Sequence, residues 1–223
     1  IEAQYLVFGN HPMNITFAKE TYDNATLDLW LNIVPLPTQL QRQEISQPEH
    51  KLTDLTLIGV NEYQAYLPYD IHFAYSFEDI RNDEFITNAD PAVLTFDSDS
   101  YIGTLEGTNY IWTVPAADLS LGTFTVDILL SLENYTQGIT SFQITVSNVP
   151  TNLELMDLYQ PGQSDGNITF DSVNERYIAY SDFTLIVNAS YEDLVISEYI
   201  ITDLAANLSY NGNNYIGNIS SIT

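Results

Sequence analysis

Large apolar residues alternate with polar or small ones along several stretches of the chain. Within 71–77 every second side chain is large and apolar, and the same period runs through 124–130 and 142–146. A period of two places alternate side chains on opposite faces of a β-strand, so these stretches predict half-buried strands. No long stretch shows the 3.6-residue period of an amphipathic helix.

Four shorter apolar runs add to these strands, at 52–60, 92–97, 101–106 and 109–114. Turn-forming residues separate the runs, as in Asp97-Ser98-Asp99-Ser100. About seven strands in roughly a hundred residues predict an all-β domain, a sandwich of two sheets. Trp112, inside the last run, is expected in the core or at its rim rather than on a ligand platform.

The chain also repeats itself. Residues 183–191 read FTLIVNASY, continued by EDL, and align with YDIHFAYSF at 69–77, continued by EDI, 114 positions earlier. The amino-terminal residues 5–9 align with 118–122, at an offset of 113. One inserted residue near Arg176 explains the change of offset. We therefore expect tandem domains with a period of about 113 residues.

The repeat predicts a domain map. Residues 1–37 are the closing strands of one repeat, 38–150 are a complete repeat, and 151–223 are the opening strands of a third. Two interpretations fit this order of partial and complete repeats. In the preferred one, the sequence is a segment of a longer tandem array. The other is a polymerising subunit, whose last half-domain the amino-terminal strands of a neighbour complete by strand addition.

Proline marks both expected junctions, in Leu36-Pro37-Thr38 and Val149-Pro150-Thr151. Proline fixes φ and lacks an N–H donor, so it ends a strand and stiffens a short connection. No Gly/Ser-rich linker separates the repeats. Semi-rigid connections between domains are the expectation.

The amino-acid composition limits the partners and the cellular environment that are expected for the protein. The formal net charge is -25, with 5 Lys+Arg against 30 Asp+Glu, which disfavours nucleic acid as a partner. Cysteine is absent, which excludes disulfides and thiolate chemistry. Neutral polar residues supply much of the expected surface, as in exterior proteins. No apolar run of 18 residues is present, so no membrane span is expected in this segment, and no signal peptide is recognisable.

Two segments carry a resemblance to a known family. Residues 119–153 read LSLGTFTVDILLSLENYTQGITSFQITVSNVPTNL, and residues 20–40 read ETYDNATLDLWLNIVPLPTQL. These resemble the closing strands of immunoglobulin-like repeats in very large archaeal surface proteins, notably Asgard-type ones. The stretch 76–92 resembles the second-strand region of invasin and intimin-like domains. The resemblance implies exported, multi-domain proteins of surface layers, stalks, filaments or adhesins.

Seven Asn-X-Ser/Thr sequons make N-linked glycosylation a candidate modification. The alternative is coincidence in a chain rich in Asn and Thr. Asn188 is expected on the outward side of a strand, between two inward residues. The sequon asparagines are Asn14, Asn24, Asn134, Asn167, Asn188, Asn207 and Asn218.

Acidic clusters are weak candidates for calcium, which prefers several oxygen ligands. Their residues are Glu78, Asp79, Asp97, Asp99, Glu192 and Asp193. The Glu-Asp pair at 78–79 recurs at 192–193, which hints at a role within every repeat. The alternative is a solvated turn, and no spacing matches an EF-hand loop. Calcium is the one cofactor considered.

Catalytic motifs are absent, and His11, His50 and His72 are scattered; at the repeat offset, phenylalanine replaces His11 and isoleucine replaces His72. We therefore expect that the protein is not an enzyme. The expected function is a structural module of an extracellular cell-surface protein or filament, with neighbouring repeats or copies of itself as partners. The alternatives are an adhesin or carbohydrate-binding module that uses tyrosines on surface glycans, and a viral fibre.

Overall fold

A computed structural model of the chain describes residues 6–21, 23–162, 168–201 and 206–218. The chain divides into two compact units, 1–147 and 148–223, which are treated separately below. The predicted boundary after 150 lies three residues beyond this division. Within the described ranges, the only helical elements are two 3-10 turns, η2 (Pro48–His50) and η3 (Ala116–Asp118), and no helix is long and apolar enough to cross a bilayer.

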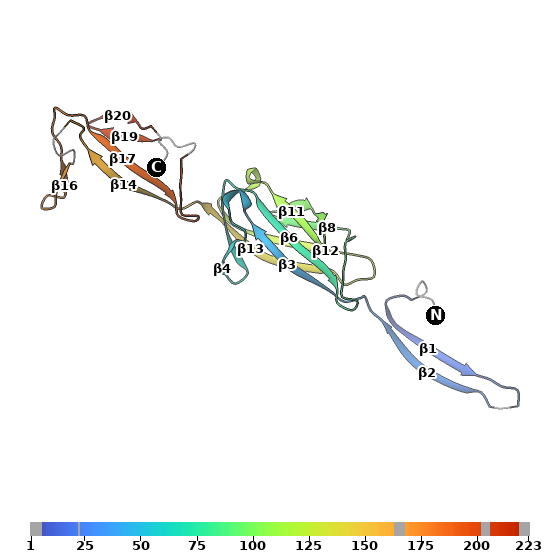
Figure 1. The fold of residues 1–223 in the computed structure, drawn as a ribbon. Helices are drawn as coiled ribbons and strands as arrows, with labels where there is room; N and C mark the ends of the chain where they lie inside the picture. Colours follow the sequence, from blue (N-terminus) through green and yellow to red (C-terminus); the bar gives the residue numbers. More distant parts are fainter. Residues whose placement is uncertain (1–5, 22, 163–167, 202–205, 219–223) are drawn as a thin grey trace. The chain divides into compact units, whose positions relative to one another are not determined.

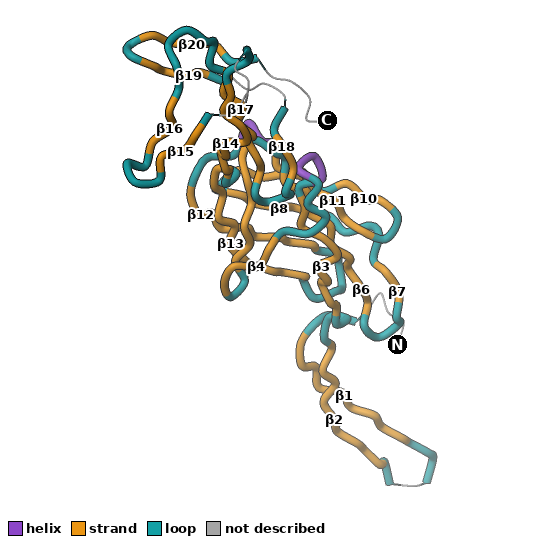
Figure 2. Tube along the Cα trace, turned by 60° about the vertical axis from the view of Figure 1, so that its left-hand side comes forward, coloured by secondary structure: helices purple, strands orange, loops and turns teal. Residues whose placement is uncertain are grey.

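Residues 38–148 form a β-sandwich, which confirms the all-β prediction (Figures 1 and 2). One sheet runs in the order β10-β11-β6-β3, with β7 paired to β6, and the other in the order β4-β5-β13-β12-β8-β9. The strands of the first sheet are β3 (Thr38–Ser46), β6 (Ile71–Asp79), β7 (Glu84–Phe85), β10 (Thr104–Glu106) and β11 (Asn109–Val114). Those of the second are β4 (Thr56–Gly59), β5 (Glu62–Leu67), β8 (Ala92–Phe96), β9 (Asp99–Ile102), β12 (Gly122–Leu130) and β13 (Gly138–Asn148).

These are eleven strands, more than the seven or so predicted. The main omissions are β3 and β5. Strand β3 reads TQLQRQEIS, and its polar side chains hide the period of two because the strand is at a sheet edge. The run 101–106 is divided between β9 and β10 at Gly103. Close packing explains this glycine, since a Cβ there would lie 2.7 Å from Trp112 Cε2.

The core lies between the two sheets and is formed by the alternating residues. Phe73 and Phe77 from one sheet, and Leu94 and Ile128 from the other, are fully buried. Trp112 is buried too, as the sequence predicts, with its ring near those of its neighbours from β6 and β11. A closed apolar core of this kind supplies the main favourable free energy of folding.

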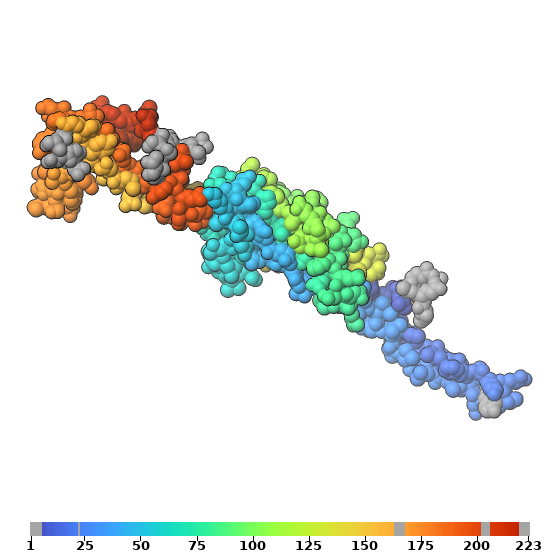
Figure 3. All heavy atoms as spheres, viewed as in Figure 1, coloured from blue at the N-terminus to red at the C-terminus, as the bar shows by residue number. Residues whose placement is uncertain are grey.

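Two further strands precede the sandwich in the first unit, β1 (Gly9–Phe17) and β2 (Ala25–Ile33). They form a hairpin and pair only with each other among the described strands. Its register is that of β12–β13, 113 positions later: Gly9 faces Ile33 as Gly122 faces Val146, and all nine pairs correspond. The atoms of the hairpin are coloured blue in Figure 3.

The second unit contains three small antiparallel sheets, β14-β17-β18, β15-β16 and β19-β20. Their strands are β14 (Thr151–Tyr159), β15 (Thr169–Asp171), β16 (Arg176–Ile178), β17 (Ile186–Asp193), β18 (Glu198–Tyr199), β19 (Asn207–Tyr210) and β20 (Asn213–Ile216). The β14–β17 pairing reproduces that of β3–β6, including a bulge after Leu155 where the first unit has one after Arg42.

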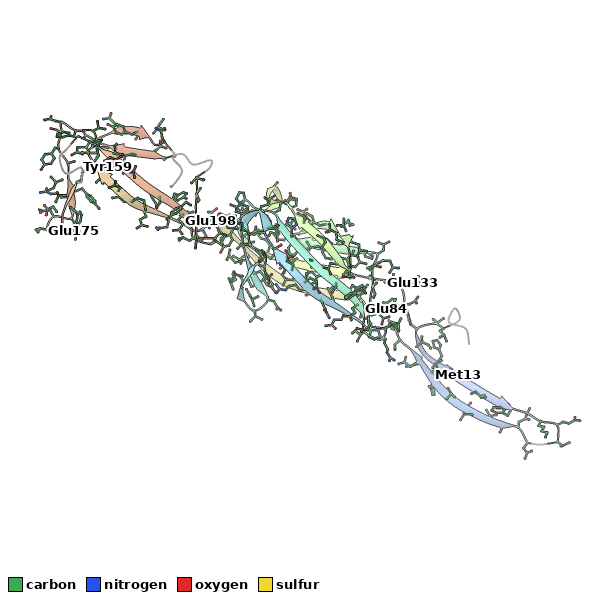
Figure 4. The ribbon with its side chains drawn as sticks, viewed as in Figure 1. Met13, Glu84, Glu133, Tyr159, Glu175 and Glu198 are labelled. Carbon is green, nitrogen blue, oxygen red and sulfur yellow. The ribbon has the colours of Figure 1, made fainter. Side chains whose placement is uncertain are left out.

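The other pairs of the second unit correspond in the same way. The registers of β17–β18 and β19–β20 repeat those of β6–β7 and β8–β9 at an offset of 114. In β15–β16 the first two pairs repeat those of β4–β5, but the bulge after Leu57 has no counterpart. Glu84 and Glu198 therefore occupy equivalent positions (Figure 4). Within the described part of 148–223, no strands correspond to β11, β12 or β13.

Candidate interaction surfaces

A buried glutamine fixes the loop beside β5 in the sandwich. Gln47 Nε2 donates hydrogen bonds to the carbonyl oxygens of Tyr66 (2.8 Å) and Tyr69 (2.9 Å). Its Oε1 accepts one from the Tyr66 N–H at 2.8 Å. Three hydrogen bonds therefore satisfy the buried amide and the loop backbone together.

The second unit repeats this arrangement with Gln160. Its Nε2 donates to the carbonyls of Tyr180 (2.8 Å) and Phe183 (3.0 Å), and its Oε1 accepts from the Tyr180 N–H (2.8 Å). The available signal in the sequence was Gln-Pro at 160–161, aligned with Gln-Pro at 47–48. The alignment alone did not predict a role for the glutamines, because the backbone groups that a buried amide binds are known only once the loop is folded.

The acidic pair at 78–79 has a structural role. Asp79 Oδ1 accepts the N–H groups of Arg81 (2.9 Å) and Asn82 (3.2 Å), and Oδ2 accepts Asn82 Nδ2 (2.7 Å). Burial acts to raise the pKa of Asp79, but these hydrogen bonds outweigh it and lower the pKa below its ordinary value. Glu78 accepts a hydrogen bond from Gln41.

Asp193 caps the equivalent turn of the second unit, where its Oδ1 accepts the N–H groups of Val195 (2.8 Å) and Ile196 (3.3 Å). Its neighbour Glu192 pairs with Tyr199 in the β17–β18 ladder. The recurrence of Glu-Asp therefore has a local cause, because the turn after β6 or β17 leaves backbone donors that a carboxylate satisfies. Asp97 and Asp99 are exposed around the β8–β9 turn. No cluster of three or more potential metal ligands occurs among the residues with described positions.

The three histidines make separate contacts, and none of the contacts described joins one histidine to another. His50 is buried and stacks on Tyr69 at 4.3 Å between ring centroids. His72 Nδ1 is 3.3 Å from the hydroxyl of Thr113 on β11, and His11 Nε2 is 2.6 Å from the Val7 carbonyl in the hairpin region.

Hydrogen bonds attach the segment after β2 to the sandwich. Leu36 donates its N–H to the Asn134 carbonyl (2.9 Å) and accepts one from the Thr136 N–H (2.8 Å). Thr38 adds N–H and hydroxyl contacts to Thr136. This connection is therefore a hydrogen-bonded junction rather than a free linker.

Both junction prolines use the same contact within their own unit. The Pro37 carbonyl accepts the N–H of Ile80 at 3.2 Å, and the Pro150 carbonyl accepts the N–H of Leu194 at 3.0 Å. Each contact ties the residue before the opening strand to the turn after β6 or β17. Each repeat is therefore entered in the same local geometry.

The described sequon asparagines, all except Asn167, are exposed; Asn167 lies outside the described residues. The hairpin and the second unit leave most of their side chains exposed, so the equivalent positions of the sandwich are more informative. These positions are exposed or half-buried, and none belongs to the core. In the order Asn14, Asn24, Asn188, Asn207 and Asn218, the equivalents are Asp127, Gln137, Ala74, Val93 and Thr104; Asn134 lies in the sandwich itself.

The β1–β2 hairpin has one apolar face that no described strand covers. Alternate residues on this face are apolar, among them Met13, Ile15, Leu29 and Leu31, with Phe17 at the end of β1 (Figure 4 labels Met13). Their equivalents on β12 and β13 face the sandwich core. The opposite face is largely polar.

Most of the exposed aromatic side chains lie outside the sandwich. In the fully described stretch 38–147, the only strongly exposed large aromatic is Phe85. The hairpin region and the second unit expose many more, namely Phe8, Phe17, Trp30, Phe170, Tyr177, Tyr180, Phe183, Tyr199, Tyr210 and Tyr215. Aromatic exposure therefore accompanies the lack of covering strands.

Comparison with known proteins adds no relative, since no protein-family model matches the chain and no curated protein is similar to it.

Proposed function

We propose that the chain is a structural module of an extracellular cell-surface protein or filament, a rod or spacer of stacked immunoglobulin-like β-sandwich repeats. The observation that carries the proposal is the recurrence of one strand register along the chain. The pairs of β3–β6, their bulge and the buried Gln47 anchor return in 148–223, and the pairs of β12–β13 occur already in β1–β2. Serial copies of one fold are typical of proteins that span distance.

The junctions support a mechanical role. Leu36 and Pro37 bind the following sandwich through backbone hydrogen bonds, and Pro150 makes the corresponding contact in its own unit. Backbone hydrogen bonds of this kind restrict the residues at a junction more than a Gly/Ser-rich linker would.

The surface chemistry supports an exterior location. The chain combines a net charge of -25 with sequons at outward positions and no cysteine. Glycans at these positions would protect strand edges without disturbing the core. Phe85 alone is strongly exposed among the large aromatics of 38–147, which favours the structural function over a carbohydrate-binding platform on each repeat.

Surface proteolysis of intact source cells tests this function. Peptides from the chain should be released before lysis, and mass spectrometry should find N-glycans on sequons such as Asn188 and Asn134. A cytosolic marker protein controls for lysis. Release only after lysis, with every sequon unmodified, would contradict the proposal.

A further inference from the structure

We propose that the outward face of the second sheet of the sandwich binds the same face of a second copy of this chain, about a two-fold axis. This contact rests on the proposed function for its biological setting and deepens it, because it would join neighbouring rods sideways. It concerns only the sandwich of residues 38–148, in which every residue is described.

An uninterrupted row of aliphatic side chains crosses this face. The strands β13, β12, β8 and β9 are neighbours, and Leu129 pairs with Ile139 on one side and with Val93 on the other. Val93 in turn pairs with Ile102. All four positions have the parity opposite to the core residues of their strands, so their side chains point away from the core. These four residues are called the aliphatic row below.

The aliphatic row is in contact with water in the complete sandwich. Ile139 is 65% exposed and Ile102 is 74% exposed, while Leu129 and Val93 between them are half-buried. The core of the sandwich contains none of the four. A contiguous apolar strip that serves no internal packing marks an interaction surface, because covering it removes apolar area from water.

N-glycosylation sequons are absent from this face, although the equivalent positions of other repeats carry them. The equivalents of Leu129, Ile139 and Val93 are Thr16, Thr26 and Asn207, which belong to the sequons of Asn14, Asn24 and Asn207. Within 38–148 the one sequon is that of Asn134, in the loop after β12, where the Asn134 carbonyl accepts a hydrogen bond from Leu36. This repeat thus has aliphatic residues on a face where other repeats have glycan acceptors, as a protein contact requires.

The aliphatic row is self-complementary, as a two-fold contact between identical faces must be. An axis that runs along the strands, between the two sheets, reverses the strand order, so β13 lies over the partner's β9 and β12 over the partner's β8. Ile139 then faces the partner's Ile102, and Leu129 faces the partner's Val93. The two most exposed side chains therefore meet, and so do the two half-buried ones.

The next row of the same face fits the same axis. It consists of polar residues paired in the same registers, namely Ser141, Asp127, Thr95 and Ser100. The axis places the Asp127 carboxylate over the partner's Thr95, whose hydroxyl can donate to it, and serine over serine. No carboxylate of these two rows faces another carboxylate. Sheets that pack face to face interdigitate their side chains in this way.

Charge and size determine the strength of the contact. The four strands contain no Lys or Arg, and each copy has a net charge of -25, so repulsion opposes the contact at low salt. The same charge disfavours an anionic bilayer or a nucleic acid as the occupant. Two rows are smaller than the roughly 20–30 residues a side of a stable interface, so we expect a dissociation constant of about 0.1–1 mM that falls as salt rises.

Two charge variants of the full chain test the face by sedimentation equilibrium. Leu129→Glu and Val93→Lys each place two unpaired charges in the centre of the dimer contact, so each alone should weaken self-association at least about 30-fold. Gln39→Glu, at an exposed position of β3 in the other sheet, adds the same charge elsewhere and should associate within about threefold of wild type.

An equimolar mixture of the two charge variants gives the decisive readout. In the mixed dimer, the introduced carboxylate of one chain faces the introduced ammonium of the other, and the second Leu129–Val93 contact is unchanged. The mixture should therefore form a one-to-one dimer within about tenfold of wild-type affinity, although each variant alone is monomeric. This restoration also excludes misfolding as the cause of the losses.

Single cysteines test the arrangement, since the chain has none of its own. From the usual sheet and strand spacings, Ile139 should lie roughly 10 Å from the partner's Ile102 but roughly 17 Å from the partner's Ile139. A mixture of Ile139→Cys and Ile102→Cys chains should therefore couple through a short bismaleimide. Ile139→Cys alone is the matched control and should couple much less.

Three results would overturn the inference. They are a wild type that stays monomeric at up to about 1 mM, even where another protein binds the aliphatic row; self-association that both charge variants leave unchanged; and equal coupling of the cysteine control. Surface exposure of the protein on cells combined with a monomeric wild type would refute only this inference. The predicted association combined with an intracellular location would refute only the proposed function.

Discussion

Replacing Gln47 with methionine should strongly destabilise the sandwich while leaving its core volume nearly unchanged. The substitution removes three hydrogen bonds of 2.8–2.9 Å, which Gln47 makes with the Tyr66 and Tyr69 carbonyls and with the Tyr66 N–H. The Tyr66 carbonyl keeps a longer hydrogen bond from the Tyr69 N–H, at 3.4 Å. Each such bond contributes about 0.5–1.5 kcal/mol, and an unsatisfied buried group costs about 1–3 kcal/mol, so we expect a loss of about 3–5 kcal/mol. Methionine keeps the length of the side chain, which limits any cavity effect.

The assay is thermal unfolding followed by circular dichroism. For about 110 residues, 1 kcal/mol corresponds to about 4 °C in Tm, so Gln47→Met should lower Tm by roughly 12–20 °C. Gln39→Met, at an exposed position of β3, the strand that ends just before Gln47, is the control and should shift Tm by less than about 2 °C. Gln160→Met removes the same three bonds from the other unit and should leave the transition of the sandwich in place. A shift below about 3 °C for Gln47→Met, or a matching shift of that transition by Gln160→Met, would refute the reasoning.

Three further predictions concern packing and ionisation. Gly103→Ala should lower the unfolding free energy by about 1–3 kcal/mol in denaturant titration, because its Cβ would press on the Trp112 ring at 2.7 Å; an unchanged midpoint would contradict the packing. Asp79 has a depressed pKa, so its ionised form stabilises the fold above about pH 4, and this contribution is lost as pH falls through the folded-state pKa. The stability advantage of wild type over Asp79→Asn should therefore shrink on acidification, with Asp97→Asn as surface control, and an advantage independent of pH would show that the carboxylate charge is not involved. Burial and a hydrogen bond to a carboxylate raise the pKa of Tyr101 to about 12, so Tyr101→Phe should remove one late-titrating phenol from an ultraviolet titration; loss of a phenol that titrates near pH 10 would contradict this environment.

Much of the fold was accessible from the sequence, because the inward and outward faces of these strands differ in polarity. The alternation of 71–77 and 124–130 located two central strands, and the burial of Trp112 followed from its apolar run. Strands made largely of polar residues could not be predicted from this alternation. Strand β3 presents glutamines and charges along a sheet edge, and its pairing with β6 depends on backbone hydrogen bonds that leave no pattern in the sequence.

The candidate sites were harder to interpret, because the same residues suit several roles. The repeated Glu-Asp pair suggested calcium, and the structure shows Asp79 and Asp193 accepting N–H groups of the turns that follow them. Gln47 and Gln160 aligned in the sequence, but only the folded loops show what their amides bind. The outward side of a strand could be assigned to a sequon such as that of Asn188 from the sequence, because successive side chains of a strand point to opposite faces of the sheet.

Electron microscopy of the native material tests the central claim most directly, namely that this chain serves as serial copies of one β-sandwich outside the cell. We expect linear structures on or released from the cell surface, with density resolving successive domains that share one fold. Successive domains along these structures should be evenly spaced, since each repeat has about 113 residues. Isolated globular particles, or neighbouring domains with unrelated folds, would contradict the account.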